Sequence, residues 1–240
     1  MRIRLILLFH IVLAICVAPA FAQGGAETGT KTFFIPGHPA RTNDPVRIRV
    51  MDGEAELKSD GRQLPNGGAY AWEAAFNGGD DWMADLSFAI KNVSPKKITC
   101  ITIFSTVVEA PFWQNESQPK LPILSFAQNR VGKRPEHALH TDDRILPPDT
   151  DAPFELAEGE EFTMPVEDPK DYLALKARIE KKLSISNVTA MVGGIMSVFF
   201  EDGTRWISIS RSYSRPAEQP GKWTTISYEE WAGQPKNSVQ

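Results

Sequence analysis

Apolar and polar residues alternate along several short stretches of the chain. In residues 46–51, Val46, Ile48 and Val50 alternate with Arg47, Arg49 and Met51. A period of two with one charged face is typical of a half-buried β-strand. Residues 98–108 are instead apolar on both faces and rich in Ile, Val and Thr, which predicts a central strand covered on both sides.

Similar stretches recur between turn sequences such as the Asp-Gly of residues 202–203. We predict further strands at residues 53–58, 84–92, 121–127, 157–166, 187–200 and 205–213. About eight short strands separated by turns at a spacing of roughly 8–15 residues indicate an antiparallel sandwich or barrel. The predicted fold class is mostly β, an antiparallel sandwich that is immunoglobulin-like in the broad sense.

One stretch has the pattern of a helix. Asp168 suits the N-cap of a helix and Pro169 suits its first position. The apolar stripe at helical spacing consists of Tyr172, Leu175, Ile179 and Leu183. We predict one helix near 168–183 whose stripe packs on the sheet, with docking of a partner as the alternative.

The first 22 residues have the pattern of a secretory signal peptide. Arg2 and Arg4 precede an apolar run from Leu5 to Val17, and residues 20–22 read Ala-Phe-Ala. A basic start, a short apolar run and an A-x-A cleavage site are the three parts of such a signal. The run is shorter than the roughly 20 apolar residues that span a bilayer. We therefore expect a secreted or periplasmic protein with no membrane insertion after cleavage.

The remaining chain divides by composition. Residues 23–45 are rich in Gly, Thr and Pro, so we expect a flexible N-terminal segment that holds at most one edge strand. The sandwich domain is predicted to cover residues 46–213. Residues 214–240 are polar and rich in Pro, which predicts a C-terminal tail with Trp223 and Trp231 as packing points.

Charge and cysteine content narrow the classes of function. The 240 residues carry a formal net charge of −4, which becomes −6 without Arg2 and Arg4. An acidic chain without a block of Lys and Arg argues against nucleic acid as a partner. Removal of the signal would leave Cys100 as the single cysteine, inside an apolar stretch. We expect it to be buried rather than reactive.

Several motifs resemble an uncharacterised family of secreted bacterial proteins. Residues 78–98 contain a Gly-Asp-Asp-Trp turn, then a strand that ends in Asn-x-Ser, then Lys and Ile at the start of the next strand. The later stretches that resemble this family are 156–166, 168–183, 199–206 (with its Asp-Gly-Thr-x-Trp hairpin) and 215–223. The family has no assigned activity, so the resemblance implies an exported sandwich and transfers no catalytic residue. The loop at 136–143 departs from the family pattern.

That loop is the best candidate for metal chemistry. It holds His137, His140, Asp142 and Asp143. Two His three residues apart share one side of a helical turn, and imidazole with carboxylate suits zinc. A solvated loop without metal is the alternative, because no third His lies nearby and open catalytic zinc sites need three protein ligands.

Two other groups have a structural and a functional interpretation. Asp80 and Asp81 would act as paired carboxylates only across a cleft, so we expect them to fix the turn instead. The six Trp could stack on sugars if their rings are exposed, or pack in the core. They are Trp72, Trp82, Trp113, Trp206, Trp223 and Trp231.

The sequence has no Gly-x-Ser-x-Gly elbow, phosphate loop or dinucleotide fingerprint. Our leading hypothesis is an exported, non-catalytic module that binds a protein or a glycan, with no catalytic residue and no cofactor. The first alternative is a metal-dependent hydrolase that uses the His137 and His140 loop with zinc. The second is a carbohydrate-binding module that uses exposed Trp.

Overall fold

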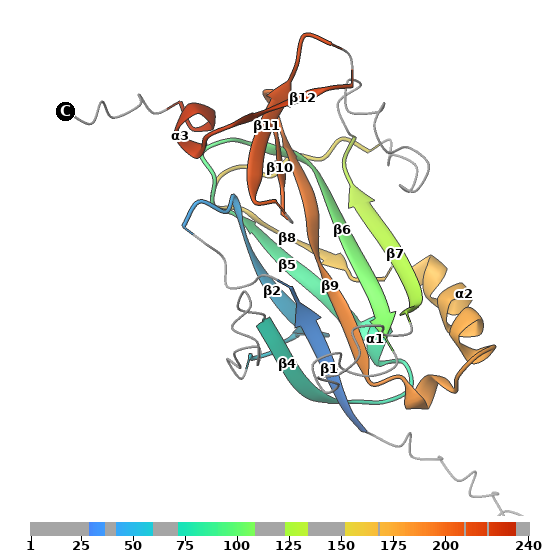
Figure 1. Ribbon diagram of the computed structural model, residues 1–240. Helices are drawn as coiled ribbons and strands as arrows, with labels where there is room; N and C mark the ends of the chain where they lie inside the picture. Colours follow the sequence, from blue (N-terminus) through green and yellow to red (C-terminus); the bar gives the residue numbers. More distant parts are fainter. Residues whose placement is uncertain are drawn as a thin grey trace, which may run out of the picture.

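The computed structural model describes residues 29–36, 42–59, 72–108, 123–133, 152–167, 169–208, 210–219 and 221–233. These residues form two packed β-sheets with a helix beside them (Figure 1). The predicted mostly-β sandwich with one helix is therefore confirmed. The predicted signal peptide lies outside the described residues.

The larger sheet is organised around the long strand β9 (Ala190–Phe200). One edge of β9 pairs along its length with β6 (Ile98–Val108), which in turn pairs with β7 (Ile123–Val131). The other edge is shared between two strands, β10 (Arg205–Ile207) and β1 (Gly29–Ile35).

The sheet therefore forks beyond β9. One branch continues from β10 to β11 (Ser212–Pro216) and β12 (Trp223–Ile226). The other branch continues from β1 to β4 (Trp72–Gly78). β1 runs parallel to β9 and antiparallel to β4, so one parallel pair departs from the antiparallel pattern.

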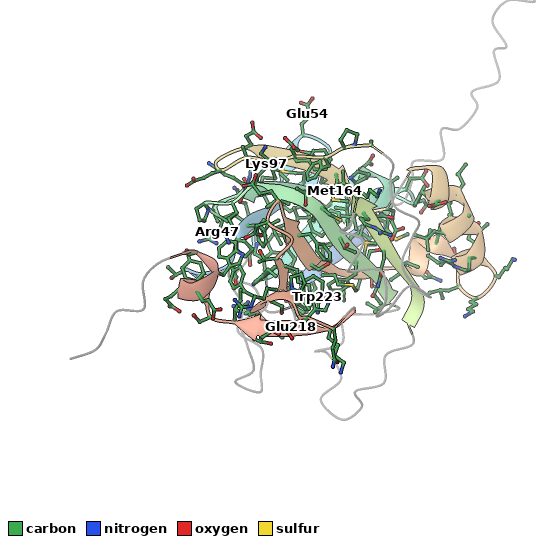
Figure 2. The ribbon with its side chains drawn as sticks, turned by 90° about the horizontal axis from the view of Figure 1, so that it is seen from above. Arg47, Glu54, Lys97, Met164, Glu218 and Trp223 are labelled. Atoms are coloured by element: carbon green, nitrogen blue, oxygen red, sulfur yellow. The ribbon has the colours of Figure 1, made fainter. Side chains whose placement is uncertain are left out.

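The smaller sheet is antiparallel, in the order β3-β2-β5-β8. Its strands are β3 (Ala55–Glu56), β2 (Val46–Asp52), β5 (Leu86–Asn92) and β8 (Glu161–Pro165). Figure 2 shows the two layers end-on, with Met164 of β8 in one layer, Trp223 of β12 in the other, and side chains filling the space between.

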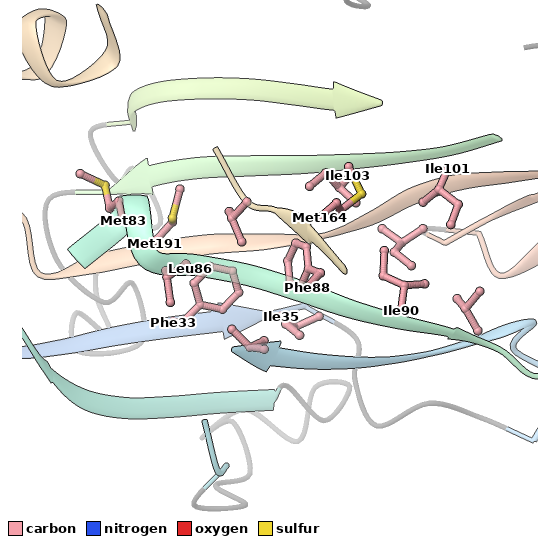
Figure 3. Close-up of a cluster of buried hydrophobic side chains, with 14 of the residues drawn as sticks. Phe33, Ile35, Met83, Leu86, Phe88, Ile90, Ile101, Ile103, Met164 and Met191 are labelled. Atoms are coloured by element: carbon pink, nitrogen blue, oxygen red, sulfur yellow. The ribbon is translucent and has the colours of Figure 1, made fainter. Parts of the chain in front are cut away.

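The core lies between the sheets (Figure 3). Phe33 of β1 meets Phe88 of β5 edge to face, with ring centroids 5.7 Å apart. Each fully buried aromatic side chain stabilises the fold by about 1.5–3 kcal/mol. A Cβ added at Gly193 would lie 2.8 Å from Cζ of Phe33. Glycine at 193 therefore leaves room for the ring of Phe33.

Helix α2 (Pro169–Glu180) lies beside β7 (Figure 1). Its predicted stripe faces the core, since Tyr172, Leu175 and Ile179 are buried, while Leu173 is 73% exposed. The described residues also contain α1 (Trp82–Asp85), the 3₁₀ turn η3 (Ile185–Asn187) and α3 (Tyr228–Trp231).

Two predicted boundaries need correction. Residues 29–35 were assigned to a flexible segment with at most an edge strand, yet β1 has partners on both sides. Its residues 31–35 are all buried, because β1 closes the gap that the short strand β10 leaves beside β9. The predicted tail likewise contains β12 and α3, and Trp231 is 2% exposed. The described sandwich therefore extends from residue 29 to residue 231.

Candidate functional site

A groove of about 550 Å³ opens at the end of the sandwich where α3 lies. Three segments line it: residues 42–44 before β2, residues 211–213 at the start of β11, and residues 225–228 between β12 and α3. We call it the Arg211 groove. These segments are far apart in sequence and meet because β11 and β12 pair while the start of β2 lies beside them.

The base of the Arg211 groove is aromatic. The ring of Tyr213 stacks on Trp231 with centroids 4.2 Å apart, and Tyr228 lies 5.8 Å from both rings. The hydroxyl of Tyr213 donates to the carbonyl of Asn43 at 2.6 Å. Burial raises the pKa of Tyr213 above its usual range, with the charges of Tyr228 and Asp44 adding to the effect. The hydroxyl therefore stays protonated and holds residues 42–44 in place.

Arg211 has a backbone conformation that is unusual for its residue type. Its φ of 48° is positive, and no other non-glycine residue among those described shares this feature. Such a conformation costs an L-residue of order 1–3 kcal/mol and persists only where its surroundings impose it. The backbone N–H of Arg211 donates to the carbonyl of Ser208 at 3.2 Å, and the residue is followed directly by β11.

The guanidinium of Arg211 has unused hydrogen-bonding capacity. Its side chain is 22% exposed, and its Nη1 lies 3.9 Å from the carboxylate of Asp44. This distance permits attraction between the charges and exceeds hydrogen-bond range. Within the part of the chain that the structure describes, this guanidinium donates no hydrogen bond, and neither does the hydroxyl of Tyr228. Both residues line the groove, so these donors can bind a ligand there.

A hydrogen-bond network holds Trp231, the ring on which Tyr213 stacks. Nε1 of Trp231 donates to Oγ1 of Thr204 at 2.9 Å, and that hydroxyl donates to Asp202 at 2.6 Å. Lys96 bonds to the same carboxylate and lies 4.8 Å from the Trp231 ring. Burial alone would raise the pKa of Asp202, but the bonds from Lys96 and Thr204 lower it below its usual range. The Asp-Gly-Thr motif is therefore an anchor for α3.

The Gly-Asp-Asp-Trp motif is also structural. Asp81 accepts hydrogen bonds from the hydroxyl of Tyr172 at 2.9 Å and from Nζ of Lys176 at 2.7 Å. The bonds from Lys176 and then Tyr172 hold the pKa of Asp81 below its usual range. The turn therefore ties α2 to the sandwich. Within the described residues the side chain of Asp80 accepts no bond of this kind, and its charge raises the pKa of the buried Lys31, which burial lowers.

The Asn-x-Ser motif forms a buried corner. Asn92 donates to the carbonyls of Lys96 and Leu156 and accepts from the backbone N–H and hydroxyl of Ser94. Asn92 is fully buried and Ser94 is 3% exposed. The motif thus connects β5 to residues 156–160 and contributes no surface site.

Lys31 and Glu167 are among the charged side chains that are buried in the fold. Nζ of Lys31 donates to the carbonyls of Val188 and Ser186 at 3.1 and 3.2 Å. Burial lowers the pKa of Lys31, and the charge of Asp80 opposes the effect. Glu167 is 3% exposed and accepts a hydrogen bond from the hydroxyl of Ser105. Both side chains thus bond to groups inside the protein.

The predicted metal site lies outside the described residues, as His137, His140, Asp142 and Asp143 all do. Zinc binding at that loop stays a prediction. Within the residues that are described, no group of three or more His, Cys, Asp or Glu is placed to hold a metal ion. Cys100 is fully buried, as predicted.

The tryptophans that the structure describes pack against other residues rather than form an exposed platform. Trp82, Trp206 and Trp231 are between 2% and 5% exposed, so their rings cannot stack on a sugar. Trp72 and Trp223 are half-buried, and the guanidinium of Arg205 covers the Trp223 ring at 3.8 Å. Trp113 lies outside the described residues.

The residues of the Arg211 groove carry no signal in the sequence. The sequence does not indicate a positive φ at Arg211, because glycine is the residue that usually adopts this backbone conformation. The sequence pattern predicts that Tyr213 ends a strand and that Tyr228 lies in a polar tail. Trp231, whose ring stacks on Tyr213, is predicted from the sequence only as a packing point.

Comparison of the chain with family models, with curated proteins and with solved structures found no match. The resemblance to a secreted bacterial family stays a prediction. Among the helices that the structure describes, none combines the length and hydrophobicity needed to cross a bilayer.

Proposed function

We propose that this protein is an exported, non-catalytic binding module whose ligand occupies the Arg211 groove. The observation that carries the proposal is the pair of donors, the Arg211 guanidinium and the Tyr228 hydroxyl, that line the groove without a hydrogen-bond partner among the described residues. Ligand sites typically combine apolar or aromatic walls with a small number of placed polar groups. Export is supported by the signal-like residues 1–22.

The groove is pre-organised for binding. Tyr213 is held by its bond to Asn43 and by stacking on Trp231, which is itself bonded to Thr204. The backbone of Arg211 is held by its N–H bond to Ser208, and the charge of Asp44 attracts its guanidinium. Binding to groups that are already ordered loses less conformational entropy, so affinity is gained without new contacts.

The chemistry of the groove favours binding over catalysis. Nucleophilic catalysis needs a nucleophile within hydrogen-bond reach of a base that a third group orients. The two described serine hydroxyls that line the groove already have partners: Oγ of Ser227 accepts from the N–H of Glu230, and Oγ of Ser212 bonds to Ser210. Asp44, an acid that lines the groove, lies 3.9 Å from the guanidinium of Arg211.

The test is a ligand titration followed residue by residue. Backbone amide spectra of residues 23–240 would be recorded with millimolar glucose, N-acetylglucosamine, glucuronate and N-acetylalanylalanine. We expect shifts from at least one probe to concentrate on residues 42–44, 211–213 and 225–228.

A matched pair of variants tests whether the probe binds in the groove or on the surface beside it. Thr225 lines the groove and its neighbour Thr224 does not, although both are exposed on β12. Thr225→Trp should fill the groove and abolish the shifts, whereas Thr224→Trp should leave them unchanged. Probes that shift residues elsewhere, or that bind Thr225→Trp as well as the wild type, would refute the proposal.

A further inference from the structure

We infer that the ligand of the Arg211 groove is a sugar acid, and that Arg211 binds its carboxylate. The inference rests on the proposed function, because it names the ligand class for the same groove. Its basis is the half-buried guanidinium of Arg211, which lines the groove and donates no hydrogen bond within the described residues.

The backbone conformation of Arg211 sets the direction in which its side chain leaves the chain. A residue with positive φ directs its side chain differently from its neighbours in an extended strand, and Arg211 directly precedes the first residue of β11. The bond from its N–H to Ser208 holds this conformation. The strand and the turn together therefore place the guanidinium between residues 42–44 and the C-terminal strands.

A carboxylate is the group that best matches this guanidinium. The planar fork of Arg binds carboxylate through two parallel N–H···O bonds, and such charge-assisted bonds are about twice as strong as neutral ones. Asp44, at 3.9 Å, attracts the guanidinium without occupying the fork. Its negative charge also disfavours a doubly charged phosphate ligand, because among the described lining residues Arg211 is the one cation that could balance it.

The rest of the lining fits a polyhydroxylated ring. Thr42, Asn43, Thr225 and Ser227 are exposed and present hydroxyl and amide groups, which can both donate to and accept from sugar hydroxyls. The half-buried Tyr228 adds an aromatic surface with an available hydroxyl. An acidic peptide would make little use of this hydroxyl-rich lining, since Ile226 is the one aliphatic side chain among the lining residues that the structure describes.

The experiment compares acidic and neutral probes on variants of Arg211. Dissociation constants for glucuronate, glucose and N-acetylalanylalanine would be measured by amide-shift titration of residues 23–240. Arg211→Gly removes the guanidinium and suits a φ of 48°, so its unfolding temperature should not fall. Arg211→Lys keeps the charge and loses the planar fork.

We expect glucuronate to bind the wild type about ten- to a hundredfold more tightly than glucose, the range that hydrogen bonds to charged groups give. Arg211→Gly should remove this preference, and Arg211→Lys should restore only part of it. The preference should also weaken at high salt, because it arises from charge.

The outcomes distinguish the inference from the proposed function. The inference would be overturned if glucose and glucuronate bound the groove with equal affinity and Arg211→Gly left both affinities unchanged. If Thr225→Trp then abolished the binding of both sugars, the proposed function would still stand. Binding of the peptide carboxylate in preference to glucuronate would overturn the sugar-acid assignment. The absence of binding of any probe in the groove would overturn both.

Discussion

At the residue scale, the fold contains a buried carboxyl whose ionisation opposes folding. Burial raises the pKa of Glu167, and Asp171 of α2 adds to the effect, while the bond from Ser105 and the charge of Arg178 reduce it. The folded chain thus holds this proton more tightly than the unfolded chain does. The free energy of unfolding should therefore decrease as pH rises from the ordinary glutamate pKa to the raised one.

Glu167→Gln tests this linkage. Glutamine can still accept the bond from Ser105 and cannot ionise. We expect the wild type to lose stability across that pH window with a slope of up to about 1.4 kcal/mol per pH unit, and the variant to lack this slope and be no less stable at neutral pH. Urea unfolding at a series of pH values provides the measurement. Glu161→Gln on the exposed face of β8 is the control, and identical slopes in wild type and Glu167→Gln would contradict the assignment.

At the element scale, turns hold the helices to the sandwich. Asp81 joins α2 through Tyr172 and Lys176, and Thr204 joins α3 through Trp231. Asp81 is 65% exposed, so solvent screening leaves its ion pair with Lys176 a minor contribution. The partly buried bond from the Tyr172 hydroxyl is the more effective link.

Tyr172→Phe should therefore destabilise the protein by about 1 kcal/mol and speed hydrogen exchange in α2. Tyr228→Phe is a matched control, because its hydroxyl makes no hydrogen bond within the described residues, and it should leave stability unchanged. Chemical unfolding with amide exchange by mass spectrometry gives both quantities. Equal effects of the two variants would show that the bond from Tyr172 to Asp81 contributes nothing to holding α2.

At the scale of the whole molecule, the proposed binding module and the predicted metal-dependent hydrolase differ in metal content. For the mature protein, expected to begin at Gln23, we predict no stoichiometric metal in elemental analysis. His137→Ala/His140→Ala should then have the same unfolding temperature as the wild type. One equivalent of zinc, lost in the double variant, would favour the hydrolase and direct a substrate search to the 136–143 loop.

Sequence patterns predict the strands and turns that depend on residues close to one another in the chain. Val46, Ile48 and Val50 show by their spacing which face of β2 is buried. Asp202 and Gly203 specify a turn. The side chain of Asp202 accepts hydrogen bonds from the backbone N–H and the hydroxyl of Thr204, so the bonds that form the turn are local. For the same reason the stripe of α2 was predicted correctly, since helical periodicity reports the buried face.

The sequence by itself therefore determined the fold class, the helix and the positions of the turns. Only the tertiary structure decided that β1 completes the fork beside β9 and that α3 docks on Thr204, because alternation shows that a strand is buried and not which strand it pairs with. The Arg211 groove is the clearest case. Its three segments meet through long-range pairing, and the positive φ of Arg211 is imposed by its neighbours rather than by its own residue type.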